Sequence, residues 1–326
     1  MIDIYKREID YIRISITDRC NLRCVYCMPS EGINLIRHEE ILSYEEIVRL
    51  CRIFASLGIS KVKITGGEPL VRKDVHKLIK SIKEIEGINN VTLTTNGILL
   101  GEQINDLVQA GLDAVNISID TLNADKYRNI TRVGNVKTVI SSIEKCLQYK
   151  YLKVKINVVP IRGKNEEDII ELINLCKSND ISIRFIELMP IGFGVNMQGI
   201  NEEEVMTIIE NNLGKLTRYS GKLGNGPSNY YSIEGYRGKI GFISAINHKF
   251  CKKCNRVRLT CEGFLKTCLQ YDIGADLKLI LRNGGSDEKI LEIIKLTVYN
   301  KPQGHNFDMV KSKNNTKYIG MSQIGG

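Results

Sequence analysis

Three cysteines near the start of the chain have the type and spacing to hold a metal centre. Cys20, Cys24 and Cys27 form the pattern C-x3-C-x2-C in the segment TDRCNLRCVYCMP. Thiolates this close in sequence can converge on one soft metal centre. A structural zinc site is normally closed by four ligands, whereas three thiolates on a cubane cluster leave one iron open. The pattern therefore favours an iron–sulfur cluster with an open iron; the alternative is a set of buried free thiols.

A second cysteine group lies in the last third of the chain. Cys251, Cys254 and Cys268 form C-x2-C-x13-C in the segment KFCKKCNRVRLTCEGFLKTCL. The spacing alone also fits a zinc knuckle, with His248 or Cys261 as the fourth ligand. Arg256 and Arg258 in the same segment count against the zinc knuckle and favour a site for an anionic ligand. Guanidinium groups beside a metal site present planar forks to phosphate or carboxylate oxygens.

The composition excludes several classes of protein. Of 326 residues, 43% are apolar and 25% are charged, so disordered and fibrous classes do not fit. Charged side chains throughout the first twenty positions argue against a secretory signal, and no apolar run approaches the roughly 20 residues of a membrane span. Ten cysteines in such a chain indicate metal-binding or catalytic thiols rather than disulfides. We therefore expect a cytoplasmic protein that does not bind a membrane.

The formal net charge of +9 is consistent with an anionic ligand such as a nucleotide, or with a solvated basic surface and no partner. No block of Arg and Lys is long enough to indicate a nucleic-acid-binding tail, so a nucleic-acid partner is not expected.

Short β-branched runs alternate with amphipathic helical stretches over the first two thirds of the chain. The predicted strands are Tyr11–Thr17, Lys61–Thr65, Asn90–Thr95, Ala114–Ile119, Lys153–Pro160 and Ile181–Ile186. The predicted helices between them are Tyr44–Leu57, Val75–Glu86, Glu102–Ala110, Val136–Tyr149 and Glu166–Asn179. Ser43 and Glu46 form a capping box for the first helix. This order predicts a parallel α/β sheet, either a partial barrel or a doubly wound layer, with its chemistry at the carboxyl ends of the strands.

The alternation ends after a helix predicted for Asn201–Leu213. A polar, glycine-rich stretch over residues 221–227 indicates a linker or long loop. We therefore divide the chain into residues 1–220 and a smaller domain of residues 221–326. The elements predicted in the smaller domain are strands at Tyr230–Ile233 and Lys239–Ile243 and helices at Ala275–Arg282 and Asp287–Tyr299.

Small and polar residues follow four of the predicted strands. Thr65-Gly66-Gly67-Glu68-Pro69 comes after the second strand, Thr94–Gly97 closes the third, Ser118 the fourth, and Met189 follows the sixth. Glycines let the backbone approach a ligand closely. A Ser or Met there is usually packing or capping, but four such loops at one edge of a sheet indicate a ligand site.

At these residues the sequence resembles the radical SAM superfamily, whose hallmark is the C-x3-C-x2-C loop after the first strand. The resemblance implies a partial (β/α)6 barrel of the TIM type, closed by a smaller C-terminal α+β domain. It implies that the open iron binds S-adenosylmethionine and that one electron from the cluster releases a 5'-deoxyadenosyl radical. The implied contacts to S-adenosylmethionine are Tyr26, Gly67, Ser118 and Met189.

The motif CNRVRLT, the stretch Asn300–His305 and the closing Met321–Gly326 narrow the resemblance to the molybdenum cofactor biosynthesis protein A family, the GTP 3',8-cyclases. That resemblance implies two [4Fe-4S] clusters, one for each cysteine group, with Cys268 rather than Cys261 as a ligand. The implied GTP contacts are Arg13, Lys63, Thr94, Lys155, Arg184, Arg256, Val257 and Arg258. Lys63 stands where the family is expected to have Arg, which keeps the charge but loses a bidentate fork.

The resemblance also implies the reaction and its partners. The radical removes the 3'-hydrogen of GTP, the ribose radical adds to guanine carbon 8, and reduction of the adduct yields 3',8-cyclo-7,8-dihydro-GTP in a reaction of the lyase class. Catalytic roles fall on Arg256, Arg258 and the terminal Gly325 and Gly326, so that deletion of both glycines is expected to abolish turnover. The implied partners are GTP, a flavodoxin- or ferredoxin-like electron donor, and cyclic pyranopterin monophosphate synthase as recipient of the product. A second copy of the chain, in a homodimer, is a further candidate.

Two alternatives stay open at this point. The first is a radical SAM enzyme that acts on RNA or on a peptide, against which CNRVRLT and the Gly-Gly tail count. The second is a non-enzymatic iron–sulfur carrier or zinc module, which would need neither the GGEP loop nor a full α/β core.

Overall fold

The computed structural model describes residues 1–221 and 223–307. Its centre is a row of six parallel strands that pair in chain order. These strands are β1 (Tyr11–Ser15), β2 (Lys61–Thr65), β3 (Asn90–Thr95), β4 (Ala114–Ser118), β5 (Lys153–Val158) and β6 (Ser182–Ile186). Each predicted strand is confirmed, with ends that differ by at most two residues.

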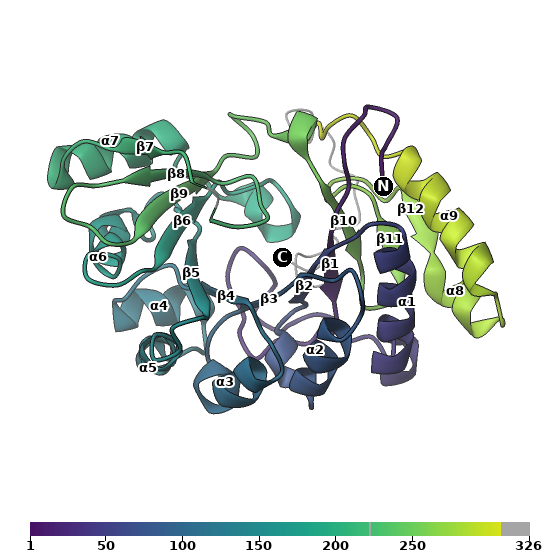
Figure 1. Cartoon of the computed structure of the whole chain (residues 1–326). Helices are drawn as coiled ribbons and strands as arrows, with labels where there is room; N and C mark the ends of the chain where they lie inside the picture. The colour runs from purple at the N-terminus through teal and green to yellow at the C-terminus, as the bar shows by residue number, and fades with distance from the viewer. Residues whose placement is uncertain (222, 308–326) are drawn as a thin grey trace.

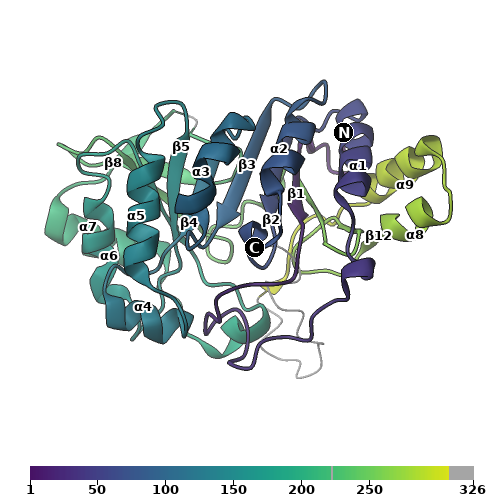
Figure 2. The ribbon, with the colours of Figure 1, turned by 90° about the horizontal axis from the view of Figure 1, so that it is seen from below.

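Helices connect these strands along the outer face of the sheet. They are α1 (Tyr44–Ser56), α2 (Val75–Lys83), α3 (Leu100–Gln109), α4 (Ala124–Thr131), α5 (Val136–Cys146) and α6 (Ile169–Asn174). Figures 1 and 2 show α1, α2, α3 and α5 side by side on this face. The predicted capping box of α1 is confirmed, because the Ser43 side chain accepts from the Glu46 N–H and the Glu46 carboxylate accepts from the Ser43 N–H. The α/β class and the partial (β/α)6 barrel are confirmed.

One predicted helix was too long, and one helix was missed. The helix predicted over 166–179 is only the six residues of α6, because Leu175, Cys176 and Lys177 donate to carbonyls three residues back and so tighten into turns. Helix α4 was missed, because its eight residues are too few for the i, i+3, i+4 spacing of Tyr127, Ile130 and Thr131 to stand out as a periodic pattern.

The C-terminal part of the chain extends the sheet at both edges. Its strands are β7 (Thr217–Tyr219), β8 (Asn229–Ser232), β9 (Lys239–Ile243), β10 (Arg256–Leu259), β11 (Phe264–Lys266) and β12 (Gly274–Asp276). Strand β9 pairs in parallel with β6, and β10 pairs in parallel with β1. In the described part of the chain the sheet therefore has twelve strands, in the order β12-β11-β10-β1-β2-β3-β4-β5-β6-β9-β8-β7. The short strands β7 and β10–β12 were not predicted.

Three further helices complete the described chain. They are α7 (Glu202–Leu213), α8 (Leu277–Arg282) and α9 (Asp287–Tyr299). Helix α7 lies beside β7 and β8, whereas α8 and α9 lie at the opposite end of the sheet (Figure 1). Among residues 1–221 and 223–307, no helix has both the length and the apolar character to cross a membrane. The division into residues 1–220 and 221–326 stays a prediction.

Candidate active site

A cavity lies on the inner side of the curved sheet, and both cysteine groups line it. Its lining includes Cys20, Cys24 and Cys27 from the loop after β1, and Cys251, Cys254 and Cys268 from the C-terminal part. The two groups are more than 220 residues apart in sequence, yet they face the same space because β10 pairs with β1.

The loop that carries the first cysteine group is held by the end of α4. The backbone N–H groups of Arg23 and Val25 donate to the carbonyls of Thr131 and Ile130. The guanidinium of Arg132 donates to the carbonyl of Arg23 at 2.8 Å and to that of Met28 at 2.9 Å. These bonds fix the loop through residues that do not themselves line the cavity.

Tyr26 is fixed at the cavity wall by a buried carboxylate. Its hydroxyl donates to Asp120 Oδ2 at 2.7 Å, while Asp120 Oδ1 accepts from the Val159 N–H at 2.8 Å. Burial raises the pKa of Asp120 to about 6 and raises the pKa of Tyr26 well above its ordinary value. The predicted cofactor contact Tyr26 is thus tied to the strand ends of β4 and β5. Asp120 was not predicted, although it follows Ser118 by two residues.

The GGEP loop, residues 66–69, packs so closely against the loop that carries the first cysteine group that a side chain at Gly67 would not fit. An added Cβ on Gly67 would lie 2.4 Å from the carbonyl oxygen of Arg19 and 2.6 Å from that of Asp18. The buried Glu68 carboxylate accepts from the Leu70 N–H and from Thr95 and Asn96. Burial raises the pKa of Glu68 to about 7. The loops after β1, β2 and β3 are therefore one packed unit.

Replacing Gly67 with Ala is expected to destabilise the protein by about 1–3 kcal/mol, because the methyl group must displace two backbone carbonyls next to Cys20. Iron retention by the first cysteine group should fall with it. Thermal unfolding and iron content after anaerobic reconstitution measure both effects. The matched control is Gly226→Ala, which also lines the cavity but has nothing within 4 Å of the added Cβ. Equal behaviour of the two variants would contradict the packing argument.

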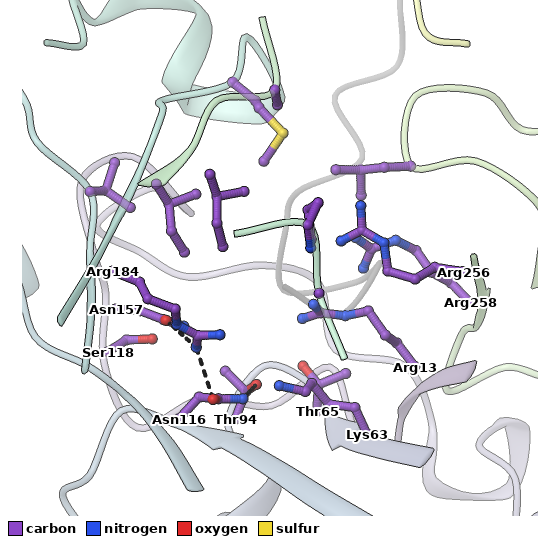
Figure 3. A pocket seen from close by; sticks show the side chains of 18 of the residues that line it. Arg13, Lys63, Thr65, Thr94, Asn116, Ser118, Asn157, Arg184, Arg256 and Arg258 are labelled. Atoms are coloured by element: carbon purple, nitrogen blue, oxygen red, sulfur yellow. Dashed lines mark hydrogen bonds between the residues drawn. The ribbon is translucent and has the colours of Figure 1, made fainter. Parts of the chain in front are cut away.

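Eight Lys and Arg side chains among the described residues line the same cavity. Two of them are Lys153 and Lys301, and the other six are called the cation group here: Arg13, Lys63, Lys155, Arg184, Arg256 and Arg258. Figure 3 shows five of them, all except Lys155, directed into the cavity from β1, β2, β6 and β10. Arg13 aligns with Arg258 on one side and with Lys63 on the other, so like charges occupy neighbouring positions on three adjacent strands.

Burying these like charges close together is electrostatically unfavourable. Burial, and then the repulsion of Arg13 and Arg184, lower the pKa of Lys63 well below its ordinary value. Burial, followed by Arg184 and Lys153, lowers the pKa of Lys155 to about 7. A polyanion in the cavity would relieve both the repulsion and the desolvation. The arrangement therefore fits a ligand with several negative charges.

Two asparagines that were not predicted hold Arg184. Its Nη2 donates to Asn116 Oδ1 at 2.8 Å and to Asn157 Oδ1 at 2.5 Å (Figure 3). Within the described residues its buried Nε has no hydrogen-bond partner. Asn116 and Asn157 could have been found from the sequence, because each is a polar residue between apolar neighbours inside a predicted strand. Lys155 is held differently, since its ammonium donates to the carbonyl of Leu223.

The remaining predicted site residues divide into three sets. Thr94, Ser118, Met189 and Gly67 line the cavity. Val257 does not, because strand alternation turns its side chain into the apolar core while Arg256 and Arg258 face the cavity. Gly325 and Gly326 lie outside the described residues.

Two members of the second cysteine group lie at a short helical turn, Cys251–Lys253, which begins at Cys251 and is followed by Cys254. Burial raises the pKa of Cys254, but Arg256 and Lys301 lower it by more, so that it lies at about 7. Lys301 also lines the cavity and was not predicted as a site residue. Cys261 is buried among other residues, and its carbonyl accepts from the Leu42 N–H.

The chemistry of the two cysteine groups fits iron–sulfur clusters. Burial, and then the neighbouring Cys27, Asp120 and Cys20, raise the pKa of the Cys24 thiol well above its ordinary value. A positively charged iron–sulfur core would offset this repulsion between thiolates. In residues 1–221 and 223–307, no three His, Cys, Asp or Glu side chains are grouped as ligands of one metal ion. A cluster binds each thiolate through a different iron, so its ligands lie farther apart than those of a single ion.

Two family models match adjoining parts of the chain. The model of the Radical SAM superfamily matches residues 14–176, and the model described as Molybdenum Cofactor Synthesis C matches residues 181–307.

Full-length relatives share a single name. The chain is 49% identical over 326 residues to the GTP 3',8-cyclase of Clostridium perfringens (strain SM101 / Type A), with 100% of both chains covered. It is 45% identical over 329 residues to the GTP 3',8-cyclase of Thermodesulfovibrio yellowstonii (strain ATCC 51303 / DSM 11347 / YP87), again with 100% of both covered. The GTP 3',8-cyclase of Lactiplantibacillus plantarum (strain ATCC BAA-793 / NCIMB 8826 / WCFS1) is 42% identical over 332 residues, covering 99% of this chain and 98% of that protein.

Among solved structures, Streptococcus suis SuiB bound to S-adenosylmethionine matches with a TM-score of 0.61 and 17% identity. The match covers 95% of this chain and 70% of that chain. At this identity the likeness shows a common fold alone.

Proposed function

Since the chain belongs to the radical SAM superfamily and, along its whole length, to the family of the GTP 3',8-cyclases, we propose that GTP is cyclised in the cavity between the two cysteine groups. The chain is an enzyme of molybdenum cofactor biosynthesis, and the superfamily implies a [4Fe-4S] cluster and S-adenosylmethionine. The observation that carries the proposal is that both cysteine groups and the cation group line one cavity.

Cys20, Cys24 and Cys27 hold the first cluster in this proposal, and Tyr26, Gly67, Ser118 and Met189 contact S-adenosylmethionine. When bound, the cluster and S-adenosylmethionine would supply a 5'-deoxyadenosyl radical able to take the 3'-hydrogen of GTP. Bonding of the ribose carbon to guanine carbon 8 would then need one further electron and a proton to give the 7,8-dihydro product. The buried hydrogen bonds of Tyr26 to Asp120 and of Glu68 to Thr95 keep these loops rigid. Loops held in this way limit the access of water to the reacting atoms.

The cation group binds the triphosphate in this proposal, with Thr94 beside it. Asn116 and Asn157 accept from Nη2 of Arg184 and so fix its guanidinium at the cavity wall. Charge-assisted bonds from several fixed cations set the position of the ribose relative to the radical source before the reaction begins. Val257 contributes its backbone only, because its side chain is buried in the core.

The second cluster belongs to the proposal as well, with Cys251, Cys254 and Cys268 as its ligands. Once bound there, this cluster would offer an open iron to the guanine ring. Arg256 lies next to Cys254 and lowers its pKa, which favours the thiolate that iron needs. A catalytic role for Gly325 and Gly326 completes the proposal.

The proposed partners follow from the chemistry. A flavodoxin- or ferredoxin-like protein supplies the electron, and cyclic pyranopterin monophosphate synthase receives the product. A cytoplasmic location also belongs to the proposal, because the cytosol keeps thiols reduced. A homodimer remains part of the proposal.

The test is turnover by the anaerobically reconstituted protein with S-adenosylmethionine and a reductant. We expect 5'-deoxyadenosine and a cyclised guanine nucleotide when GTP is present. ATP is the matched control, since it offers the same triphosphate without guanine. Cys254→Ala and Arg256→Ala should lose product formation. Radical formation that depends on an RNA or a peptide instead of GTP would overturn the proposal.

A further inference from the structure

A buried ion pair near the N-terminus has no role in the function described so far. The side chain of Arg7 is 5% exposed and that of Asp3 is 0% exposed. Arg7 Nε donates to Asp3 Oδ2 at 2.5 Å, and Asp3 Oδ1 accepts from the N–H groups of Tyr5 and Arg7, each at 2.9 Å. A buried ion pair persists only where further hydrogen bonds satisfy its remaining polar atoms.

The other four N–H donors of Arg7 bind backbone carbonyls from the C-terminal part of the chain. The acceptors are Cys251 at 3.0 Å, Gln303 at 2.8 Å, Lys301 at 3.3 Å and Pro302 at 2.7 Å. A guanidinium has five N–H donors in a fixed plane, so Arg7 uses all of them. A lysine could not reach the same set, because its ammonium is a single point charge.

These carbonyls belong to the surroundings of the second cysteine group. Cys251 is a member of the group. The ammonium of Lys301 donates to the carbonyl of Thr267, the residue before Cys268. Gly304 packs against Cys251, since an added Cβ would lie 3.2 Å from the Cys251 Cβ and 3.4 Å from its Sγ. The Arg7 guanidinium therefore joins the helical turn of Cys251 to residues 301–303. Lys301 in turn holds Thr267, the residue before Cys268.

We propose that Arg7, held by Asp3, is a positioning residue that sets the spacing between Cys251 and Cys268. The inference rests on the proposed function, in which these cysteines bind the second cluster. Arg7 contacts the backbone behind the ligands and does not touch the cluster. Loss of such a partner typically costs roughly ten- to a hundredfold in metal affinity.

Arg7→Met keeps the length of the stem and removes every donor. The full-length variant is reconstituted anaerobically, and its iron content and the electron paramagnetic resonance spectrum of the reduced protein are measured with and without GTP. We expect the second-cluster signal to weaken and its response to GTP to be lost, while the first-cluster signal and its response to S-adenosylmethionine persist. Arg7→Lys should show a smaller change in the same direction, and it decides the question if Arg7→Met does not fold.

Arg49→Met is the matched control. Arg49 also ties the N-terminal part to the C-terminal part, through Asp287 at 2.8 Å and the carbonyl of Gly285 at 2.9 Å, but it binds none of the carbonyls that Arg7 binds. Both signals should persist in this variant. An unchanged second-cluster signal in Arg7→Met and Arg7→Lys, or equal loss of both signals, would overturn the inference. Absence of a second cluster from the unsubstituted protein would instead count against the proposed function.

Discussion

Cys24→Ala is expected to reduce GTP-dependent formation of 5'-deoxyadenosine to background. Cys24 is the central member of the first cysteine group, and its carbonyl accepts from the N–H groups of Cys27 and Met28. The substitution leaves this backbone turn in place and removes one sulfur, so two thiolates cannot hold the cluster against loss of iron. Anaerobic turnover, together with the visible absorption of the reconstituted protein, measures both results.

Cys261→Ala is the control for this prediction. Cys261 is 1% exposed and lies outside the cavity lining, so its replacement removes a buried thiol of the same size without touching either cysteine group. It should keep its iron and its turnover, apart from a small loss of stability from the missing sulfur. Turnover in Cys24→Ala that matches Cys261→Ala would remove the first cluster from the mechanism.

Lys63→Met is expected to have two opposite effects of large size. The affinity for GTP should fall about 10- to 100-fold, because one charge-assisted contact to the triphosphate is lost. The ligand-free protein should become more stable by about 1 kcal/mol or more, since a buried cation beside Arg13 and Arg184 is replaced by an apolar chain of similar length. Equilibrium binding of GTP and thermal unfolding without ligand measure the two effects.

Two further variants serve as controls for Lys63→Met. Lys80→Met, on the exposed side of α2, should change neither quantity. Lys63→Arg restores the charge in the form that the family is expected to have, and it should recover the affinity. A gain of stability in Lys63→Met without any loss of affinity would mean that Lys63 is a buried charge outside the substrate site.

The cation group also predicts a dependence on pH. Burial, followed by Arg184 and Lys153, places the pKa of Lys155 at about 7, so its side chain is charged below that pH and neutral above it. A triphosphate binds the charged form better, and GTP affinity should therefore fall as the pH rises through 7. This part of the pH dependence should disappear in Lys155→Met, and a comparison of binding curves for the two proteins isolates it from the titration of GTP itself.

The amino-acid sequence alone determined the central strands, the two cysteine groups and the family. A strand such as Lys61–Thr65 and the loop that follows it are local patterns, because alternation, glycine and turn residues act over a few positions. Thr94, Ser118 and Met189 could be placed near one another from sequence for the same reason, since parallel strands end at one edge.

Only the tertiary structure decided how the C-terminal part completes the site. Strand β10 has four residues, too few for a periodic signal, and its partner β1 lies more than 240 residues earlier. Pairing over that separation depends on which faces are buried together and on register, which no local pattern encodes. That register aligns Arg258 with Arg13 and turns Val257 into the core. The contacts of Arg7 with Cys251 and Lys301 arise in the same way, because they exist only once both ends of the chain lie beside each other.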